Sequence, residues 1–156
     1  MIPAATTRGP MAGDDRAQRE GEDHRRAPRV TVLVADDNAR FRAGIVRALR
    51  RHDDVDVVAE AEDGAEALER VRALRPAVVL ADVRMPGLDG LGLARAVTDD
   101  PALRDVRVLL LSARHDAALQ ADAADAGAVD CLDKSTSRRE ICDAVRGVVV
   151  PGTAAS

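Results

Sequence analysis

Five polar residues that could do chemistry each end or closely follow a short apolar run. They are two adjacent carboxylates after the first run, a third after the third run, a hydroxyl at the end of the fourth and an ammonium beyond the fifth: Asp36, Asp37, Asp82, Ser112 and Lys134. If the runs are parallel strands, their carboxyl ends meet at one edge of the sheet, and these groups converge there. Each residue alone has an ordinary explanation as a turn, cap or surface group. The joint placement is what predicts a site.

The three carboxylates of this set indicate a magnesium site. Clustered carboxylates repel one another, so their ionisation is costly unless a cation lies among them. Oxygen ligands without His or Cys suit Mg²⁺, which keeps several waters and also binds phosphate oxygens. A carboxylate beside such an ion can attack phosphorus and form an aspartyl-phosphate. The ion, Lys134 and the Ser112 hydroxyl would together neutralise the charge on the phosphoryl oxygens.

The pattern from Val30 onward is typical of an α/β fold with a parallel sheet, because short apolar runs alternate with helical patterns. The expected strands are residues 31–35, 55–59, 78–81, 106–111 and 129–132. Right-handed crossovers between them leave few topologies, and the doubly wound sandwich is the simplest.

Five helices are expected in addition to these strands. The first has an apolar stripe, and the second is expected to run from Asp63 to before Pro76 with Leu68, Val71 and Leu74 buried. The third covers about residues 91–98. The fourth, about 116–126, is rich in Ala and ends at Gly127, a good C′ residue. The last opens with a Ser137–Glu140 capping box and is expected to bury Ile141, Val145, Val148 and Val149.

Composition excludes several classes of function. Phe41 is the only aromatic residue, so platforms for stacking bases are missing, and the net charge of −4 gives no general attraction to nucleic acid or an anionic membrane. No apolar run approaches the ~20 residues of a membrane span, and the N-terminus lacks the apolar centre of a signal peptide. Cys131 and Cys142 are expected to be reduced thiols. We therefore expect a cytoplasmic protein.

The chain divides into three parts by composition. Residues 1–29 are rich in Gly, Pro, Arg and acidic residues and are expected to form a disordered tail. Residues 30–150 form the expected domain, and residues 151–156 a short C-terminal tail.

Residues 30–150 resemble the receiver domains of two-component response regulators. The matching stretches are Val32-Leu33-Val34-Ala35-Asp36-Asp37, Asp82-Val83-Arg84-Met85-Pro86-Gly87-Leu88-Asp89-Gly90, Leu111-Ser112-Ala113 and Leu132-Asp133-Lys134. The resemblance implies the flavodoxin-like receiver fold, a doubly wound five-stranded parallel sheet with the order 2-1-3-4-5.

The resemblance also implies a role for each site residue. Asp82 would accept a phosphoryl group from a sensor histidine kinase, and Asp37 and Asp82 would bind Mg²⁺ directly. Asp36 would contact the metal less directly, and the backbone carbonyl of Arg84 would be a further ligand. Ser112 would be the switch hydroxyl, and Lys134 would pair with the phosphate. The chain would be no enzyme beyond its own phosphoryl transfer and dephosphorylation.

Within the family, residues 57–64 and 84–90 look most like the NarL/LuxR-type branch, whose members usually continue into a helix-turn-helix domain. Residues 150–156 are too few for an output domain, so we expect a stand-alone regulator without direct DNA or membrane binding. Its partners would be the kinase, an unknown downstream protein and, in one variant of this hypothesis, a second copy bound after phosphorylation. The alternative is the receiver part of a NarL/LuxR-type transcription factor that has lost its DNA-binding domain.

Two further alternatives are a degenerate receiver and a flavin- or nucleotide-binding relative of the same architecture. Retention of all five site residues argues against the first. The carboxylate edge and the lack of a stacking aromatic argue against the second.

Two positions depart from the family pattern. Ser135, where the wider family often has Pro, matters less, since the NarL-type branch often lacks that Pro. Cys131 stands where most receivers have an aromatic switch residue, and a thiol cannot fill the space that such a ring fills. We expect the signal to leave through the face formed by the fourth helix, fifth strand and fifth helix, with a muted or different switch and a mobile fourth helix.

Overall fold

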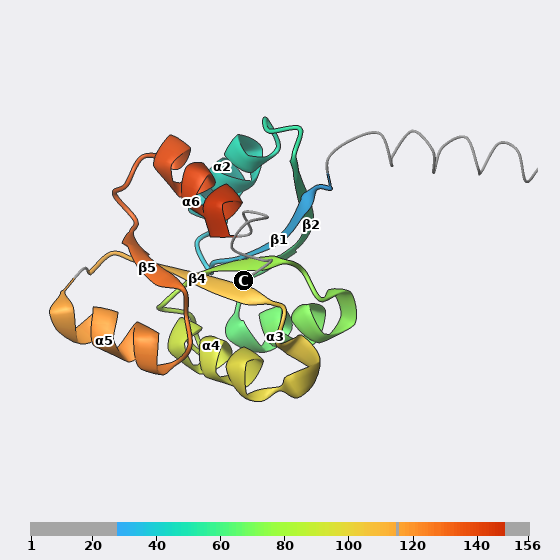
Figure 1. Ribbon diagram of the computed structural model, residues 1–156. Coiled ribbons are helices and arrows are strands. Elements are labelled where there is room, and N and C mark those ends of the chain that lie inside the picture. Colours follow the sequence, from blue (N-terminus) through green and yellow to red (C-terminus); the bar gives the residue numbers. More distant parts are fainter. Residues whose placement is uncertain (1–27, 115, 149–156) are drawn as a thin grey trace, which may run out of the picture.

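The computed structural model describes residues 28–114 and 116–148, in which strands and helices alternate (Figure 1). The strands are β1 (Val30–Ala35), β2 (Val55–Ala61), β3 (Val78–Asp82), β4 (Arg107–Ser112) and β5 (Asp130–Asp133). The helices are α2 (Ala39–Leu49), α3 (Gly64–Leu74), α4 (Gly90–Asp99), α5 (Ala117–Asp125) and α6 (Arg138–Val148), with a 3₁₀ turn η1 (Pro101–Leu103) after α4.

The five strands form one parallel sheet in the order β2-β1-β3-β4-β5, which confirms the fold that the resemblance implied. All five residues of the central strand β3 are buried, as expected for a strand covered on both faces. Each strand lies within two residues of its predicted bounds. Asp82 and Ser112 are the last residues of their strands, so each of these strands ends one residue later than predicted.

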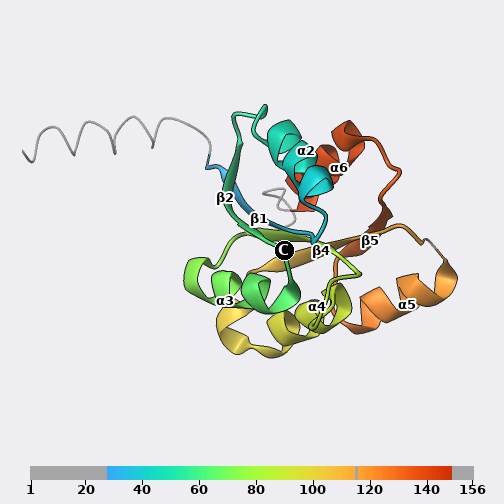
Figure 2. The same cartoon turned by 180° about the vertical axis from the view of Figure 1, so that it is seen from behind.

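Helices cover both faces of the sheet. α2 and α6 lie on one face and α3, α4 and α5 on the other, as the two opposite views show (Figures 1 and 2). Alternate residues of each strand enter two separate apolar clusters. Val32 and Leu80, for example, pack toward α2 and α6, whereas Leu33 and Val79 pack toward α3 and α4. Aliphatic side chains dominate both clusters, which together hold the strand ends in place.

Short polar side chains begin the helices. The N-cap carboxylate of Asp63 accepts a hydrogen bond from Glu66 N, and the Ser137 hydroxyl accepts one from Glu140 N. Glu66 itself accepts from Glu62 N, one residue before the cap. After α5, Gly127 has a φ of +89°, which confirms its predicted role as the residue that ends the helix.

The predicted burial of Leu74 was wrong, because this side chain is 50% exposed. It is the last residue of α3, and the chain turns away at Arg75 with a φ of 47°. Val71, Ile141 and Val145 are buried in the core, and Leu68 and Val148 are half-buried and pack against it. Val149 and the predicted tails, apart from exposed Pro28 and Arg29, lie outside the described residues. None of the helices described here is long and apolar enough to cross a membrane.

Candidate functional site

Three carboxylates meet at the carboxyl edge of the sheet. Asp36 directly follows β1, Asp37 is its neighbour, and Asp82 ends β3. One carboxylate oxygen from each lies within 4.8 Å of the other two. The central strands β1 and β3 are adjacent in the sheet, and this pairing brings together residues that are far apart in sequence.

Asp36 is the most buried of the three, with 1% of its surface exposed. Its Oδ1 accepts a hydrogen bond from Asn38 N at 2.8 Å. Its Oδ2 lies 2.8 Å from Lys134 Nζ, as an ion pair rather than a well-directed hydrogen bond. A buried carboxylate oxygen without a hydrogen bond is costly, and the Lys134 ammonium is the cation that offsets its charge.

The Asp82 carboxylate is also buried but has two donors. Its Oδ2 accepts from Lys134 Nζ at 3.2 Å and its Oδ1 from Arg84 N at 3.3 Å. Burial, followed by the negative charge of Asp36, raises the pKa of Asp82 above its ordinary value despite Lys134. The site therefore holds more negative charge than it neutralises by itself.

Lys134 is the one lysine in the sequence, and the other residues among its 23 Lys and Arg are all arginines. Its Nζ contacts both Asp36 and Asp82 and lies 4.3 Å from the centroid of the Phe41 ring. Burial opposes its charge, but the contact with Asp36 and the charges of both carboxylates outweigh burial and raise the pKa of Lys134. The ammonium thus stays charged between the two acids.

Asp37 is exposed, and its carboxylate forms no hydrogen bond or ion pair with another described residue. It lines an open depression together with Arg84 and the loop that follows β3. The donors here are all oxygen atoms, and one wall is open to solvent, as suits an ion that keeps several waters. The residues present therefore fit Mg²⁺.

Ser112 lies at the end of β4, one position beyond the Leu111 that pairs with Asp82. It is 5% exposed, and its Oγ accepts a hydrogen bond from Arg114 N at 3.0 Å. The hydroxyl lines a hollow between the β3 loop and α5, next to Val83 and Arg84. All five residues predicted from the sequence thus lie along one edge of the sheet.

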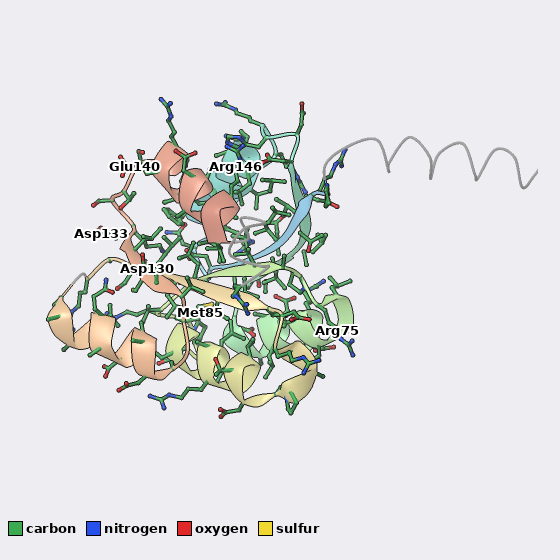
Figure 3. The ribbon with its side chains drawn as sticks, viewed as in Figure 1. Arg75, Met85, Asp130, Asp133, Glu140 and Arg146 are labelled. Carbon is green, nitrogen blue, oxygen red and sulfur yellow. The ribbon has the colours of Figure 1, made fainter. Side chains whose placement is uncertain are left out.

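The loop after β3 is held close to the strand. Gly90 N donates to Val83 O at 2.8 Å, and a methyl group at position 90 would lie 2.8 Å from Val83 Cα. Met85 is anchored in the apolar cluster on the α3 and α4 side (Figure 3). Gly90 therefore lets the loop fold back so that Arg84 stays beside Asp82.

Two contacts at this site were not predicted. Phe41 was assigned only to the apolar stripe of its helix, although its ring also lies against Lys134. Arg42 Nη1 donates to the carbonyl of Asp36 at 2.6 Å, and its Nε donates to Glu60 at 3.1 Å. Arg42 thus fixes the backbone that carries Asp36 and Asp37. No sequence motif quoted above signals either contact.

Comparison with known proteins gives the family. The family model described as the response regulator receiver domain matches residues 32–146. This chain belongs to that family. The receiver contains the whole sheet except its first two residues and includes all five site residues.

Similar proteins carry receivers in different contexts. The probable transcriptional regulatory protein NarL of Mycobacterium tuberculosis is 45% identical over 129 residues, which are 79% of this chain and 59% of that protein. A protein-glutamate methylesterase/protein-glutamine glutaminase of Myxococcus xanthus is 41% identical over 108 residues, 69% of this chain and 31% of that protein. The chain therefore spans less than two thirds of the length of these relatives.

Solved structures agree with the fold. The signal receiver domain of the M. tuberculosis NarL protein superposes with a TM-score of 0.74 at 44% identity, covering 78% of this chain and 97% of that domain. A LuxR-family two-component response regulator from Aurantimonas has a TM-score of 0.71 at 29% identity, covering 77% of this chain and 84% of that one.

Proposed function

We propose that this receiver accepts a phosphoryl group on Asp82 from a sensor histidine kinase. The observation that carries the proposal is the buried Asp82 carboxylate, held between Lys134 and Arg84 N within a cluster of three acids. Membership of the receiver family supports it. Apart from this transfer and its reversal by water, the proposal assigns the chain no catalytic activity.

In the proposed transfer, a carboxylate oxygen of Asp82 forms a bond to phosphorus while the bond from phosphorus to the donor atom breaks. The bonding electron pair leaves with the donor. Asp37, Asp82 and the Arg84 carbonyl would hold Mg²⁺, with Asp36 in a less direct role. When bound, Mg²⁺ would neutralise charge on the phosphoryl oxygens.

Lys134 and Ser112 would contact the transferred group. Lys134 now contacts the carboxylate oxygens of Asp36 and Asp82, so a phosphoryl group on Asp82 would offer its ammonium a more highly charged partner. The Ser112 hydroxyl lies at the neighbouring strand end and would donate to another phosphoryl oxygen. Its present contact with Arg114 N would couple the site to the loop before α5.

For the output, we propose that the protein contacts its target through the face made of α5, β5 and α6. In this proposal the receiver acts alone in the cytoplasm, and in one variant it pairs with a second copy after phosphorylation. Domain bounds of 30–150, with tails at 1–29 and 151–156, belong to this proposal. The second candidate is the receiver part of a NarL/LuxR-type transcription factor. The 45% identity to the NarL protein, of which this chain spans 59%, favours that candidate.

Intact-mass spectrometry after incubation with acetyl phosphate and Mg²⁺ tests the acceptor. Wild type should gain one phosphoryl group, and Asp82→Asn should gain none. Asp105→Asn is the matched control, because Asp105 is an exposed carboxylate at the opposite end of the sheet. Undiminished labelling of Asp82→Asn would overturn the proposal.

A further inference from the structure

A second concentration of charge lies between α2 and α6, away from the acidic edge. A hollow of about 250 Å³ is lined by five basic side chains and by no acidic one. The basic residues are Arg47, Arg51, His52, Arg138 and Arg139. None of the five residues of the acidic site lines it. This local positive charge occurs in a chain whose net charge is −4.

The four arginines of this hollow form no ion pair with any other residue that the structure describes. Two nearby acids, Asp54 and Asp143, contact Arg146 instead, at 2.9 and 3.8 Å. Arg146 lies further along α6 than Glu140, as the labelled side chains show (Figure 3). The positive charge in the hollow is therefore not balanced by those acids.

The placement of two of these arginines is unfavourable for α6 itself. Arg138 and Arg139 begin α6, where the helix already carries a partial positive charge. Arg47 lies in the last turn of α2 and Arg51 lies two residues beyond its end, so both positive charges reach the hollow from the carboxyl end of that helix. A bound anion would relieve this repulsion at the start of α6 and would also offset the charges of Arg47 and Arg51.

Gly44 makes room for one of the guanidinium groups. A methyl group at position 44 would lie 2.8 Å from Arg138 Cζ. The missing side chain therefore allows the Arg138 guanidinium to lie directly against α2. This contact brings charge from the two helices together around one hollow.

We propose that this hollow binds a compact condensed phosphate, either an inorganic polyphosphate or the triphosphate of a nucleotide. Guanidinium groups offer paired donors that match phosphate oxygens. The volume is below the ~300–1,000 Å³ usual for sites that enclose whole drug-sized ligands. No Phe, Tyr or Trp lines it and four arginines do, so the phosphate rather than a base would be recognised. A second copy of the chain is a poor occupant of the hollow, because symmetric binding would place the same arginines against each other.

Isothermal titration calorimetry of the full chain at low ionic strength, without Mg²⁺, tests this site. The titrants are tripolyphosphate, ATP, adenosine and a short DNA duplex. Tripolyphosphate and ATP should bind one to one, whereas adenosine should not bind. Equal affinities would assign the condensed phosphate itself, and tighter ATP binding would assign a nucleoside triphosphate as the source.

The variants distinguish a defined site from general attraction. Arg51→Gln with Arg139→Gln should weaken tripolyphosphate binding about tenfold or more, since each removes a charged donor. Gly44→Ala should also weaken binding by displacing Arg138. The control pair Arg95→Gln with Arg104→Gln makes the same charge change at exposed positions elsewhere and should leave the affinity nearly unchanged.

Three outcomes would overturn the proposal. One is no binding of tripolyphosphate up to millimolar concentration. Another is an equal loss in both double variants, which would indicate general attraction to the surface. The third is tighter binding of duplex DNA than of tripolyphosphate, which would make the surface a nucleic-acid contact. Acceptor chemistry at Asp82 does not depend on any of these results.

Discussion

At the scale of single residues, the choice of lysine at position 134 has a physical reason. The sequence has one lysine among 23 Lys and Arg residues, and that lysine lies between Asp36 and Asp82 at 2.8 and 3.2 Å. An ammonium is a compact charge that can contact two converging carboxylates, whereas a guanidinium is planar and wider. In the absence of a metal ion, Lys134 supplies the positive charge at this site.

We predict that Lys134→Ala binds Mg²⁺ at least as well as wild type, because removing the ammonium removes a competing cation. In metal-free buffer, its free energy of unfolding should fall by about 1–3 kcal/mol, because two buried carboxylates lose their partner. Calorimetric Mg²⁺ titration and urea unfolding followed by circular dichroism measure these quantities. Clearly weaker Mg²⁺ binding by the variant would contradict this account of Lys134.

The two adjacent acids should differ in their effect on the metal. Asp37 has an exposed carboxylate that forms no hydrogen bond or ion pair with another described residue, whereas both oxygens of Asp36 already have contacts with protein groups. Asp37→Ala should therefore weaken Mg²⁺ binding and slow phosphorylation together, and Asp36→Asn should do so less. Mg²⁺ titrations of both variants beside wild type check the order. Equal affinity in wild type and Asp37→Ala would exclude Asp37 as a ligand.

At the scale of elements, α5 is the part of the fold with the least burial. Within its nine residues only Ala123 is buried. Polar contacts supplement this weak packing: Gln120 Nε2 donates to the Cys131 carbonyl at 2.7 Å, and Thr98 Oγ1 donates to the Ala126 carbonyl at 3.0 Å. Such an element can open at low cost.

This packing leads to a prediction about signalling. Cys131 is 1% exposed in the cluster beneath α5, and burial raises the pKa of its thiol, so it acts as a small apolar side chain. Because it cannot fill the space left by a movement of Ser112, α5 should move instead. Hydrogen exchange with and without beryllofluoride and Mg²⁺ should change mainly in residues 112–134. Changes restricted to residues 82–90, with α5 unaltered, would show that this face does not respond.

At the scale of the whole molecule, α6 is tied to the far side of the sheet by more than apolar contacts. Arg146 on α6 donates to Asp54, which precedes β2, at 2.9 Å across 92 positions of sequence. The hydrogen bond from Arg146 is the main reason why the pKa of Asp54 lies below its ordinary value of 3.8. Both side chains are about 39% exposed, so solvent screens the pair.

Because the pKa of Asp54 is lowered on folding, the pair stabilises the protein above the unfolded pKa and is lost as pH falls through the folded one. Asp54→Asn should therefore reduce the free energy of unfolding by about 0.2–1 kcal/mol at neutral pH. The difference from wild type should begin to shrink near pH 3.8 and should disappear once the pH has fallen through the lower pKa of the folded state. Urea unfolding across pH measures it, with exposed Asp56→Asn as control. A difference that persists unchanged in acid would exclude a charge-based contribution.

The features of the fold and of the site that could be predicted from the sequence are those set by interactions between residues close together in the chain. Apolar runs such as residues 106–111 predicted the strands, and the meeting of parallel strand ends predicted the convergence of Asp36, Asp82 and Lys134. The strand order came from the family resemblance. The burial of Leu74 was mispredicted because a helical pattern does not reveal where the chain turns off the sheet. The contact of Phe41 with Lys134 depends on where α2 lies relative to the residues that follow β5, which no local pattern encodes.

The central claim is that Asp82 itself becomes phosphorylated, and chemical trapping tests it most directly. Wild type is incubated with acetyl phosphate and Mg²⁺ and then treated with borohydride, which reduces an acyl phosphate to an alcohol. Peptide mass spectrometry should then find homoserine at position 82 and unmodified aspartate at positions 36 and 37. Homoserine at another carboxylate, with Asp82 unmodified in a phosphorylated sample, would contradict the account.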